Sequence, residues 1–282
     1  MRKNTFRKIL VTGASSGMGY EVARLLASAG YEVYGAARRV ALMEPLRSFG
    51  VTPVALDVSS VHSISVCLEV VGAVDVLVNC AGYGSFGAIE NVPDAEARRQ
   101  LEVNVFGLAA LCRAVIPGMR ERGYGRIVNI SSVAGRACLY FGGWYNVSKY
   151  SVEAFSDALR MELKPFGIDV VMVEPGATRT DWGIIAADHL AESSAGSAYE
   201  EPALREAYSM RKGFSLKLFA SPSVVARCIV RAATVRRPRA RYLTGSFART
   251  IVFWHTVLPA RWWDAIMRSL SSPRLSRLVE RL

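Results

Sequence analysis

The sequence contains few of the residues that bind metal ions or form disulfide frameworks. Its 282 residues include only three histidines, His62, His189 and His255, which are too scattered for metal-ligand spacing. The five cysteines, at positions 67, 80, 112, 138 and 228, form neither a Cys-x-x-Cys pair nor a cluster with histidine. We therefore expect no metal site, and reduced, mostly buried thiols, as is typical of a cytoplasmic protein.

Long apolar runs are missing as well. A transmembrane helix needs ~20 consecutive apolar residues, and we find no run of that length. The segment Met1–Lys8 resembles the charged start of a signal peptide, but the apolar run Ile9–Val11 that follows is too short to complete one. The sequence therefore predicts neither a spanning helix nor a cleaved signal. With 51% apolar and 21% charged residues, the chain is expected to pack as one large domain or two small ones.

Positive charge is concentrated in the C-terminal quarter. The formal net charge is +11, but from Arg205 to the C-terminus there are 16 lysines and arginines against 3 acidic residues. The preceding 204 residues are slightly acidic, with 19 basic and 21 acidic side chains. This asymmetry favours an anionic substrate, lipid headgroups or an acidic partner. We expect no nucleic acid partner, because no interleaved recognition motif accompanies the charge.

A strand, a glycine-rich turn and a helix are predicted at the N-terminus. Ile9–Thr12 is a short apolar run typical of a buried strand, and Tyr20–Ala29 has the apolar spacing of a helix. Between them lies Gly13-Ala-Ser-Ser-Gly-Met-Gly19. Glycines permit a tight turn and a close backbone approach, and the N–H groups of a helix start attract a pyrophosphate. This segment therefore predicts a dinucleotide-binding turn.

The residues after the second predicted strand favour NADP(H) over NAD(H). The strand Tyr31–Ala37 ends without the acidic residue that would hold a free ribose 2′-hydroxyl, and Arg38 and Arg39 follow it. A guanidinium in this place pairs with a 2′-phosphate. Arg38 is the expected main contact and Ser15 a helper. The alternative is that both arginines are solvated turn residues.

Strands and helices continue to alternate, which predicts a doubly wound parallel sheet with helices on both faces. Asp57 and Val58 end the third predicted strand, where a carboxylate would lie near the adenine amino group. The fourth strand is followed by Asn79-Cys-Ala-Gly82, whose small residues permit a close approach of the cofactor. Further strands are expected at 126–131, 168–173 and 242–244, the last of them the seventh.

One constellation of polar residues predicts a reaction centre. Ser132 follows an apolar run, and Tyr145 and Lys149 lie four residues apart on one face of a predicted helix that reaches about Pro165. An ammonium beside a phenol favours the phenolate, so Lys149 is expected to lower the pKa of Tyr145. Ser132 would donate a hydrogen bond to a carbonyl oxygen while Tyr145 supplies the proton. The alternative is a chance Tyr-x-x-x-Lys match.

A buried amide is predicted in the long helix from Pro93 to Met119. Asn104 lies there in an otherwise apolar stretch, and a polar amide in such surroundings needs hydrogen-bonding partners. It is either a member of the reaction centre or a structural residue that bends the helix.

The C-terminal part of the chain leaves several interpretations open. Residues 181–221 look like a helical insertion, which is either a mobile lid over the substrate or a surface excursion. A helix is predicted from Ser221 to Val235. For the basic, aromatic tail Phe247–Leu282 there are four alternative interpretations. It closes the substrate pocket, it forms a dimer contact, it lies on a membrane surface as an amphipathic helix, or it packs on the body of the protein.

Six motifs in order resemble those of the short-chain dehydrogenase/reductase family. They are Thr12-Gly-x-x-x-Gly-x-Gly19, Asn79-x-Ala-Gly82, Asn104, Ser132, Tyr145-x-x-x-Lys149 and Pro175-Gly176. The resemblance covers residues 7 to about 245, and its small departures, Met18 and Cys80, do not touch the chemistry. It implies that residues 1–282 form one Rossmann-fold domain with a C-terminal extension.

By this resemblance the chain is an NADP(H)-dependent enzyme that interconverts carbonyl and alcohol groups. Ser132, Tyr145, Lys149 and Asn104 form its catalytic tetrad. Lys149 also binds the nicotinamide ribose, Asn104 holds a water that links Lys149 to solvent, and Thr180 contacts the carboxamide. The expected cofactor contacts are Gly13, Ser15, Ser16, Gly17, Met18, Gly19, Arg38, Arg39, Asp57, Val58, Asn79, Ala81, Gly82, Tyr145, Lys149, Pro175, Gly176, Thr178 and Thr180.

Within the family, the length, the run Val33–Arg39 and the tail sequence Leu-Pro-x-Arg-Trp-Trp-Asp look like the branch of 17β-hydroxysteroid dehydrogenases, retinol dehydrogenases and acyl-dihydroxyacetone-phosphate reductases. That branch implies a lipophilic substrate, steroid-, retinoid- or fatty-acyl-like. Its expected contacts are Ser132, Phe141, Trp144 and Tyr145.

The resemblance also implies an oligomer, and one alternative function stays open. A homodimer or homotetramer is expected through the long helices at about 93–119 and 145–164, in the cytoplasm, with membrane contact through the tail as an addition. The rival is a non-catalytic cofactor-binding sensor or scaffold. Such proteins usually lose the tyrosine or the lysine, whereas this chain keeps Tyr145 and Lys149.

Overall fold

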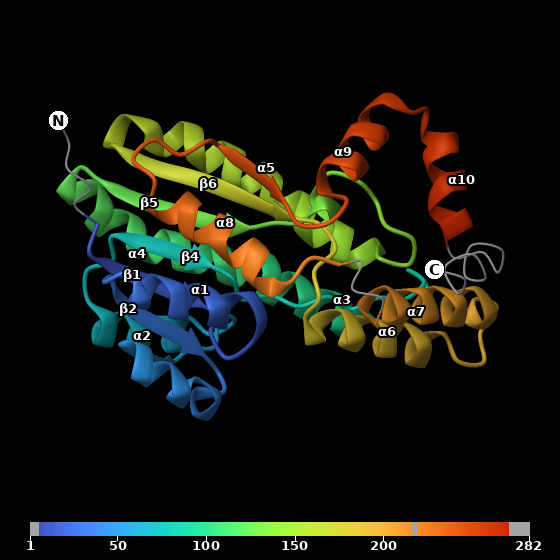
Figure 1. The fold of residues 1–282 in the computed structure, drawn as a ribbon, viewed down its shortest axis with the longest axis horizontal. Coiled ribbons are helices and arrows are strands. Elements are labelled where there is room, and N and C mark those ends of the chain that lie inside the picture. The colour runs from blue at the N-terminus through green and yellow to red at the C-terminus, as the bar shows by residue number, and fades with distance from the viewer. Residues whose placement is uncertain (1–5, 216–218, 271–282) are drawn as a thin grey trace.

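Seven parallel strands form the sheet of the structure, a computed structural model that describes residues 6–215 and 219–270. The strand order is β3-β2-β1-β4-β5-β6-β7 (Figure 1). The predicted doubly wound seven-stranded sheet is confirmed. The order reverses between β1 and β4, and ligands of such sheets bind at that point, beyond the carboxyl ends. The strands are β1 (Lys8–Thr12), β2 (Glu32–Ala37), β3 (Val51–Ala55), β4 (Val76–Asn79), β5 (Gly125–Ile130), β6 (Ile168–Pro175) and β7 (Arg241–Thr244).

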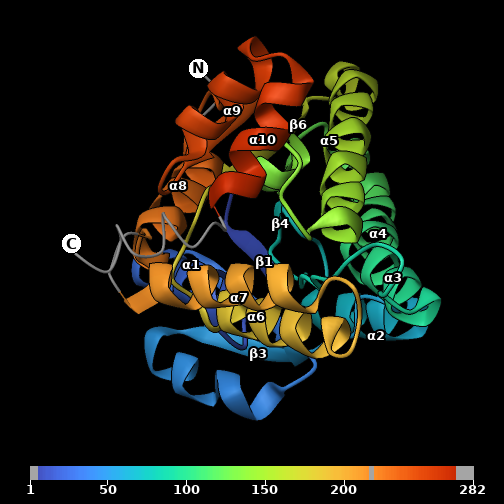
Figure 2. The same cartoon turned by 90° about the vertical axis from the view of Figure 1, so that its right-hand side faces the viewer.

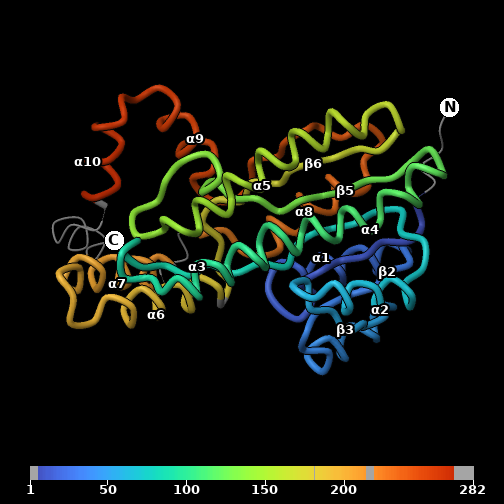
Figure 3. Tube along the Cα trace, turned by 180° about the vertical axis from the view of Figure 1, so that it is seen from behind, coloured from blue at the N-terminus to red at the C-terminus, as the bar shows by residue number. Residues whose placement is uncertain are grey.

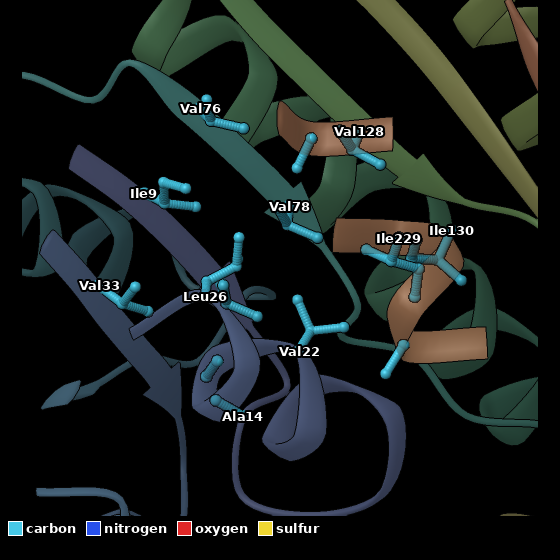
Figure 4. Close-up of a cluster of buried hydrophobic side chains, with 14 of the residues drawn as sticks. Ile9, Ala14, Val22, Leu26, Val33, Val76, Val78, Val128, Ile130 and Ile229 are labelled. Carbon is cyan, nitrogen blue, oxygen red and sulfur yellow. The ribbon is translucent and has the colours of Figure 1, made fainter. Parts of the chain in front are cut away.

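Helices cover both faces of the sheet, as the tube in Figure 3 shows from behind. On one face lie α1 (Gly17–Ser28) and α8 (Pro222–Thr234), and on the other α2 (Val61–Val71), α4 (Leu108–Arg122) and α5 (Gly143–Leu163). Each face of the sheet carries its own hydrophobic core, the first under α1 and α8 and the second under α2, α4 and α5. Because strand side chains alternate, Ile9 points into the first core and Leu10 into the second. Figure 4 shows the first core, where Val22 and Ile229 meet strand residues. Burial on both faces explains why the strands are nearly continuous apolar runs.

Two predicted helices depart from regular α-helical geometry. The first, η1 (Val40–Phe49), is a 3₁₀ helix that contains Pro45, which lacks the N–H that an α-helix interior uses. The long helix is divided into α3 (Asp94–Leu101), a π-helical segment η2 (Glu102–Gly107) and α4. Asn104 lies within η2. Such segments are frequent at functional sites.

The long helix also passes the length and composition test for a membrane span. From Asp94 to Arg122 it runs 29 residues, with an apolar window of mean hydropathy 1.4, and it is the one such helix among the described residues. The expectation that no run of ~20 consecutive apolar residues occurs still holds for this helix, because Glu102 and Arg113 interrupt it. Its apolar character has a second explanation, because Leu108, Leu111 and Met119 are buried in the second core against the sheet.

Four further helices lie beyond the carboxyl ends of the central strands (Figures 1 and 2). α6 (Asp181–Ser194) and α7 (Glu200–Ser215) pack together as one hairpin, so the predicted insertion is helical. The tail forms a second hairpin, α9 (Ala248–Val257) and α10 (Ala260–Leu270), interrupted at Pro259. Residues 216–218 of the predicted insertion and 271–282 of the predicted tail lie outside the described residues.

Candidate active site

A cavity of about 1000 Å³ lies at the carboxyl end of the sheet. It is lined by the glycine-rich turn, the segments that follow β2 to β6, the start of α5, and both helical hairpins. Of the residues predicted for the site, it brings together Gly13, Ser15, Ser16, Gly17, Met18, Gly19, Arg38, Arg39, Asp57, Val58, Ala81, Gly82, Ser132, Tyr145, Lys149, Pro175, Gly176, Thr178 and Thr180.

The glycine-rich turn has the close packing that a dinucleotide site needs. Gly13 has a φ of 68°, and a Cβ on it would lie 2.9 Å from the backbone of Ala81. A Cβ on Gly19 would lie 2.4 Å from the carbonyl oxygen of Gly13. Ser16, the N-cap of α1, makes no capping hydrogen bond through its side chain with any described residue, which leaves the N–H groups of the helix start available to a ligand. The turn therefore fits a pyrophosphate group.

Charged residues line the cavity beyond the end of β2. Asp57 accepts hydrogen bonds from the backbone N–H and the hydroxyl of Ser59, which lower the pKa of Asp57, and the positive charges of Arg38 and Arg99 act in the same direction. Arg39 lines the same end of the cavity. Arg99 lies on α3, and no pattern in the sequence predicted that it would line the cavity with Arg38. This end of the cavity thus holds the carboxyl groups of Asp57 and Glu96 together with three arginines.

Ser132 and Tyr145 both line the cavity, and the Ser132 hydroxyl donates a hydrogen bond of 3.5 Å to the backbone carbonyl of Pro175. Ser132 follows β5, and its Oγ accepts a hydrogen bond of 3.1 Å from the backbone N–H of Ala134. Tyr145 lies in the first turn of α5 and is buried. Burial raises the pKa of Tyr145 to about 12, although a hydrogen bond with Ser132 lowers it in part. The tyrosine is therefore protonated at neutral pH and suited to donate a proton.

Lys149 lies one helical turn after Tyr145, as predicted, but its effect on the tyrosine differs from the prediction. Its Nζ donates a hydrogen bond of 2.9 Å to the backbone carbonyl of Ile130 and lies 5.8 Å from the centroid of the Tyr145 ring. Burial lowers the pKa of Lys149 to about 8. The expected lowering of the Tyr145 pKa by Lys149 is therefore wrong for this structure, because burial of the phenol disfavours its charged form and dominates the shift.

Asn104 lies behind the cavity wall. Its Oδ1 accepts a hydrogen bond of 3.0 Å from the backbone N–H of Tyr83, and its Nδ2 donates to the Tyr83 carbonyl and to the hydroxyl of Ser148. A Cβ on Gly82 would lie 3.0 Å from the same Oδ1 and 3.9 Å from Nζ of Lys149. The amide thus joins the loop after β4 to the catalytic helix, and its predicted role in holding a water stays a prediction.

The Asn79 side chain points away from the cavity. Its Nδ2 donates a hydrogen bond of 2.9 Å to Oδ1 of Asn129, the residue directly beside it on β5. Asn129 in turn donates to the hydroxyl of Ser156 on α5. This buried chain of polar groups links β4, β5 and α5. The Asn79 side chain, which was predicted to contact the cofactor, is therefore part of the interior of the fold.

Two aromatic side chains that the sequence did not single out pack against Tyr145. The ring of Trp182 lies 5.1 Å from the Tyr145 ring, and that of Phe86 lies 5.7 Å from it. Both line the cavity. The remaining apolar lining near them comes mostly from the two hairpins: Leu139, Ile185, Met210, Phe219, Ile251 and Met267.

The two aromatic residues predicted to touch substrate, Phe141 and Trp144, lie outside this lining. Phe141 has a φ of 56° and packs against Tyr140 and Tyr199. Trp144 precedes Tyr145 on a helix, where each residue is rotated by about 100° from the last, so the two side chains face different directions.

The described residues show no cluster suited to a metal ion. Within residues 6–215 and 219–270, no group of three or more His, Cys, Asp and Glu side chains comes together in that way. The five cysteines are free, with Cys67 and Cys112 buried and Cys138 exposed. Burial raises the pKa of Cys67 to about 11, so its thiol is unreactive at neutral pH.

The chain is similar to many proteins of one enzyme family. The family model described as "short chain dehydrogenase" matches residues 7–188. A probable short-chain type dehydrogenase/reductase VdlC of Helicobacter pylori is 35% identical over 265 residues, 92% of this chain and 96% of the relative. Human retinol dehydrogenase 8 is 34% identical over 255 residues, which cover 84% of this chain and 81% of that protein.

Solved structures agree with this similarity. A short-chain dehydrogenase from Streptomyces avermitilis superimposes with a TM-score of 0.75 at 34% identity, covering 97% of this chain and 98% of that one. An actinorhodin polyketide ketoreductase solved with NADPH superimposes with a TM-score of 0.68 at 31% identity, covering 86% of this chain and 96% of that one.

Proposed function

The chain belongs to the short-chain dehydrogenase family, an oxidoreductase family, and on that premise we propose that it interconverts a carbonyl group and an alcohol on a lipophilic small molecule with NADP(H). The observation that carries the proposal is that the buried side chains of Ser132, Tyr145 and Lys149 line one cavity together with the glycine-rich turn. The tetrad is completed by Asn104.

The proposed mechanism assigns one task to each side chain. The Ser132 hydroxyl donates a hydrogen bond to the carbonyl oxygen and stabilises its developing charge. Tyr145 donates its proton to the same oxygen, and the Lys149 ammonium stabilises the phenolate that remains. Asn104 fixes the loop at Tyr83 against the catalytic helix through its hydrogen bonds to the Tyr83 backbone and to Ser148. When bound, the nicotinamide supplies the hydride to the carbonyl carbon, or accepts it in the reverse direction.

The protonation states favour reduction at neutral pH. A phenol with a pKa of about 12 is a ready proton donor but a poor base, so Tyr145 suits the addition of a proton to a carbonyl oxygen. Oxidation of an alcohol needs Tyr145 as the phenolate, which requires the charge of Lys149 or a high pH. We therefore propose that the carbonyl is the working substrate.

Two features support NADP(H) and a lipophilic substrate. Arg38 and Arg39 follow β2 in the place where a guanidinium pairs with a ribose 2′-phosphate, and the similar polyketide ketoreductase was solved with NADPH. Trp182 and Phe86 give the region around Tyr145 an apolar wall. The similar human protein is named a retinol dehydrogenase, and retinol is itself a lipophilic alcohol.

The test is a substitution that removes one hydroxyl. Purified protein is assayed with NADPH against a panel of lipophilic ketones and aldehydes, together with Tyr145→Phe and Tyr150→Phe. Tyr150 lies on the same helix, is 39% exposed and does not line the cavity, so its variant is the matched control. We expect Tyr145→Phe to lower turnover by about 10²–10⁴-fold, the range typical of general acid catalysis, with NADPH binding retained. Near-normal turnover in Tyr145→Phe on a confirmed substrate would contradict the mechanism.

A further inference from the structure

The hairpin of α9 and α10 presents one face to the cavity. Ile251 of α9 and Met267 of α10 line the cavity. Trp263 is 6% exposed, donates a hydrogen bond of 3.2 Å from Nε1 to the carbonyl of Cys138, and packs edge-on against His255. These contacts fix the hairpin beside the cavity, opposite α6 and α7 (Figures 1 and 2).

The other face of the hairpin is apolar and exposed. Trp262 is 66% exposed although its neighbour Trp263 is buried, and Ile266, one turn later, is exposed with it. On α9 the exposed side chains are Phe253, Trp254 and Val257, and the rings of Phe253 and Trp254 lie 5.3 Å apart. Large exposed aromatic side chains gathered on one short element mark an interaction surface.

Arginines are interleaved with these apolar residues. Arg249 lies four residues before Phe253 on α9, and Arg261 and Arg268 lie seven residues apart on α10, so they share a face next to Trp262. All three are exposed, and none forms an ion pair within the described part of the chain. Asp264 is the one acidic residue in the sequence from 248 to 270. The exposed face therefore combines aromatic rings with unneutralised positive charge.

We propose that this face of the α9–α10 hairpin binds the surface of an anionic lipid bilayer. Tryptophan and phenylalanine settle at the boundary between headgroups and acyl chains, and arginines beside them attract anionic headgroups. A second copy of the chain is a poorer occupant, because a two-fold contact would set this positive face against itself. A bilayer supplies both the apolar layer and the opposite charge.

Docking on a bilayer also bears on where the substrate comes from. This one point rests on the proposed function. Because Ile251 and Met267 of the hairpin also line the cavity, docking brings the cavity next to the lipid phase. A lipophilic carbonyl compound then partitions from the bilayer into the cavity without crossing water. The substrate class is accordingly one that resides in membranes.

The binding test uses the whole chain and vesicles of defined composition. Sedimentation is measured with neutral phosphatidylcholine vesicles and with vesicles that contain phosphatidylglycerol in addition. We expect binding to the anionic vesicles, weakened by added salt as surface charges are screened. Trp254→Ala with Trp262→Ala, and separately Arg249→Ser with Arg261→Ser and Arg268→Ser, should each lower the partition coefficient at least tenfold.

Controls separate this proposal from the proposed function. Phe49→Ala with Phe166→Ala removes two aromatic side chains that are exposed elsewhere, and it should bind vesicles like the wild type. Tyr145→Phe should also bind normally, since docking does not need turnover. Carbonyl reduction without vesicle binding would overturn the docking alone, and vesicle binding without reduction would overturn only the proposed reaction. Equal binding to both vesicle types, or dissociation of an oligomer by the tryptophan variants without vesicle binding, would contradict the bilayer as occupant.

Discussion

The Nζ of Lys149 donates a hydrogen bond of 2.9 Å to the backbone carbonyl of Ile130, the last residue of β5. The contact ties the catalytic helix to the strand that leads into Ser132, so the positions of all three catalytic side chains depend on one another. It also buries the ammonium, which lowers the pKa of Lys149 to about 8. The charge that the mechanism needs is therefore held close to its titration point.

The pH dependence of reduction should follow Lys149. A base whose pKa is lowered to about 8 is charged below that pH and neutral above it, so kcat/KM for carbonyl reduction should fall as pH rises through about 8. Lys149→Arg keeps the charge at every pH, so whatever activity it retains should not fall in this range. The exposed Lys164, changed to arginine, is the control. A wild-type profile that is flat between pH 7 and 9 would contradict this role.

Cofactor preference should depend on Arg38. Removing a guanidinium that pairs with a 2′-phosphate costs a charged hydrogen bond, so Arg38→Ala should weaken NADPH binding by about 10–100-fold and NADH binding little. Fluorescence titration with both cofactors measures this. Arg47→Ala is the control, since Arg47 pairs with Glu44 on the exposed side of η1. Equal or tighter binding of NADH by the wild type would favour NAD(H) and an oxidative role.

The positions of the strands could be anticipated because each strand carries a strong local signal. The core strands are apolar runs, and Gly30, Gly50 and Gly123 mark the ends of the elements that precede three of them with positive φ angles. The glycine-rich turn and the pair Tyr145 and Lys149 depend on short spacings along a turn or a helix. Such local geometry is fixed by the sequence alone.

The rest of the site depends on contacts between distant segments. Asn79 resembles a cofactor contact until Asn129 is known to lie beside it on β5. Trp182 reaches Tyr145 only because α6 lies beyond the carboxyl ends of the strands beside the start of α5 (Figure 1), and no local pattern predicts that placement. The position of Trp144 could have been anticipated, since neighbours on a helix face different ways. The shift in the Tyr145 pKa could not, because it depends on how deeply both side chains are buried.

Substrate size selection should be sensitive to Gly84. A Cβ at this position would lie 2.3 Å from Cζ2 of Trp182, so Gly84→Ala must displace the indole ring that packs on Tyr145. Overpacking of this kind costs about 1–3 kcal/mol of folding stability. The displaced ring should also raise KM for a bulky ketone. A small aldehyde should be affected less. Gly118→Ala on α4, which meets only the end of the Arg122 side chain, should change neither KM.

Stability should fall with rising pH because of Glu174, which is fully buried on β6. Its Oε1 lies 3.0 Å from Nε of Arg241 and 3.5 Å from Nη1 of Arg136. Burial, and next the charge of Glu153, raise the pKa of Glu174 to about 7, although the two arginines oppose this. Arg241 also pairs with Glu153 and Asp157 of α5, and Asp157 pairs with Arg160, so one guanidinium serves three carboxyl groups.

The sign follows from the proton count. Between pH 4.5, the ordinary pKa of a glutamate, and about 7, the folded protein keeps a proton on Glu174 that the unfolded chain has released. The stabilisation from that proton is complete below pH 4.5 and is lost as pH rises through about 7. At ~1.4 kcal/mol for each pKa unit, the loss is at most about 3.5 kcal/mol.

Glu174→Gln isolates this effect, because an amide stays neutral at every pH. The melting temperature of the variant minus that of the wild type should become more positive by several degrees between pH 5 and pH 8. Glu162→Gln, an exposed glutamate on α5, should show no comparable trend. A difference that is flat with pH, or that moves against the variant, would mean that Glu174 is ionised throughout. The two arginines would then outweigh burial, and Glu174 would add no pH-dependent stability between 4.5 and 7.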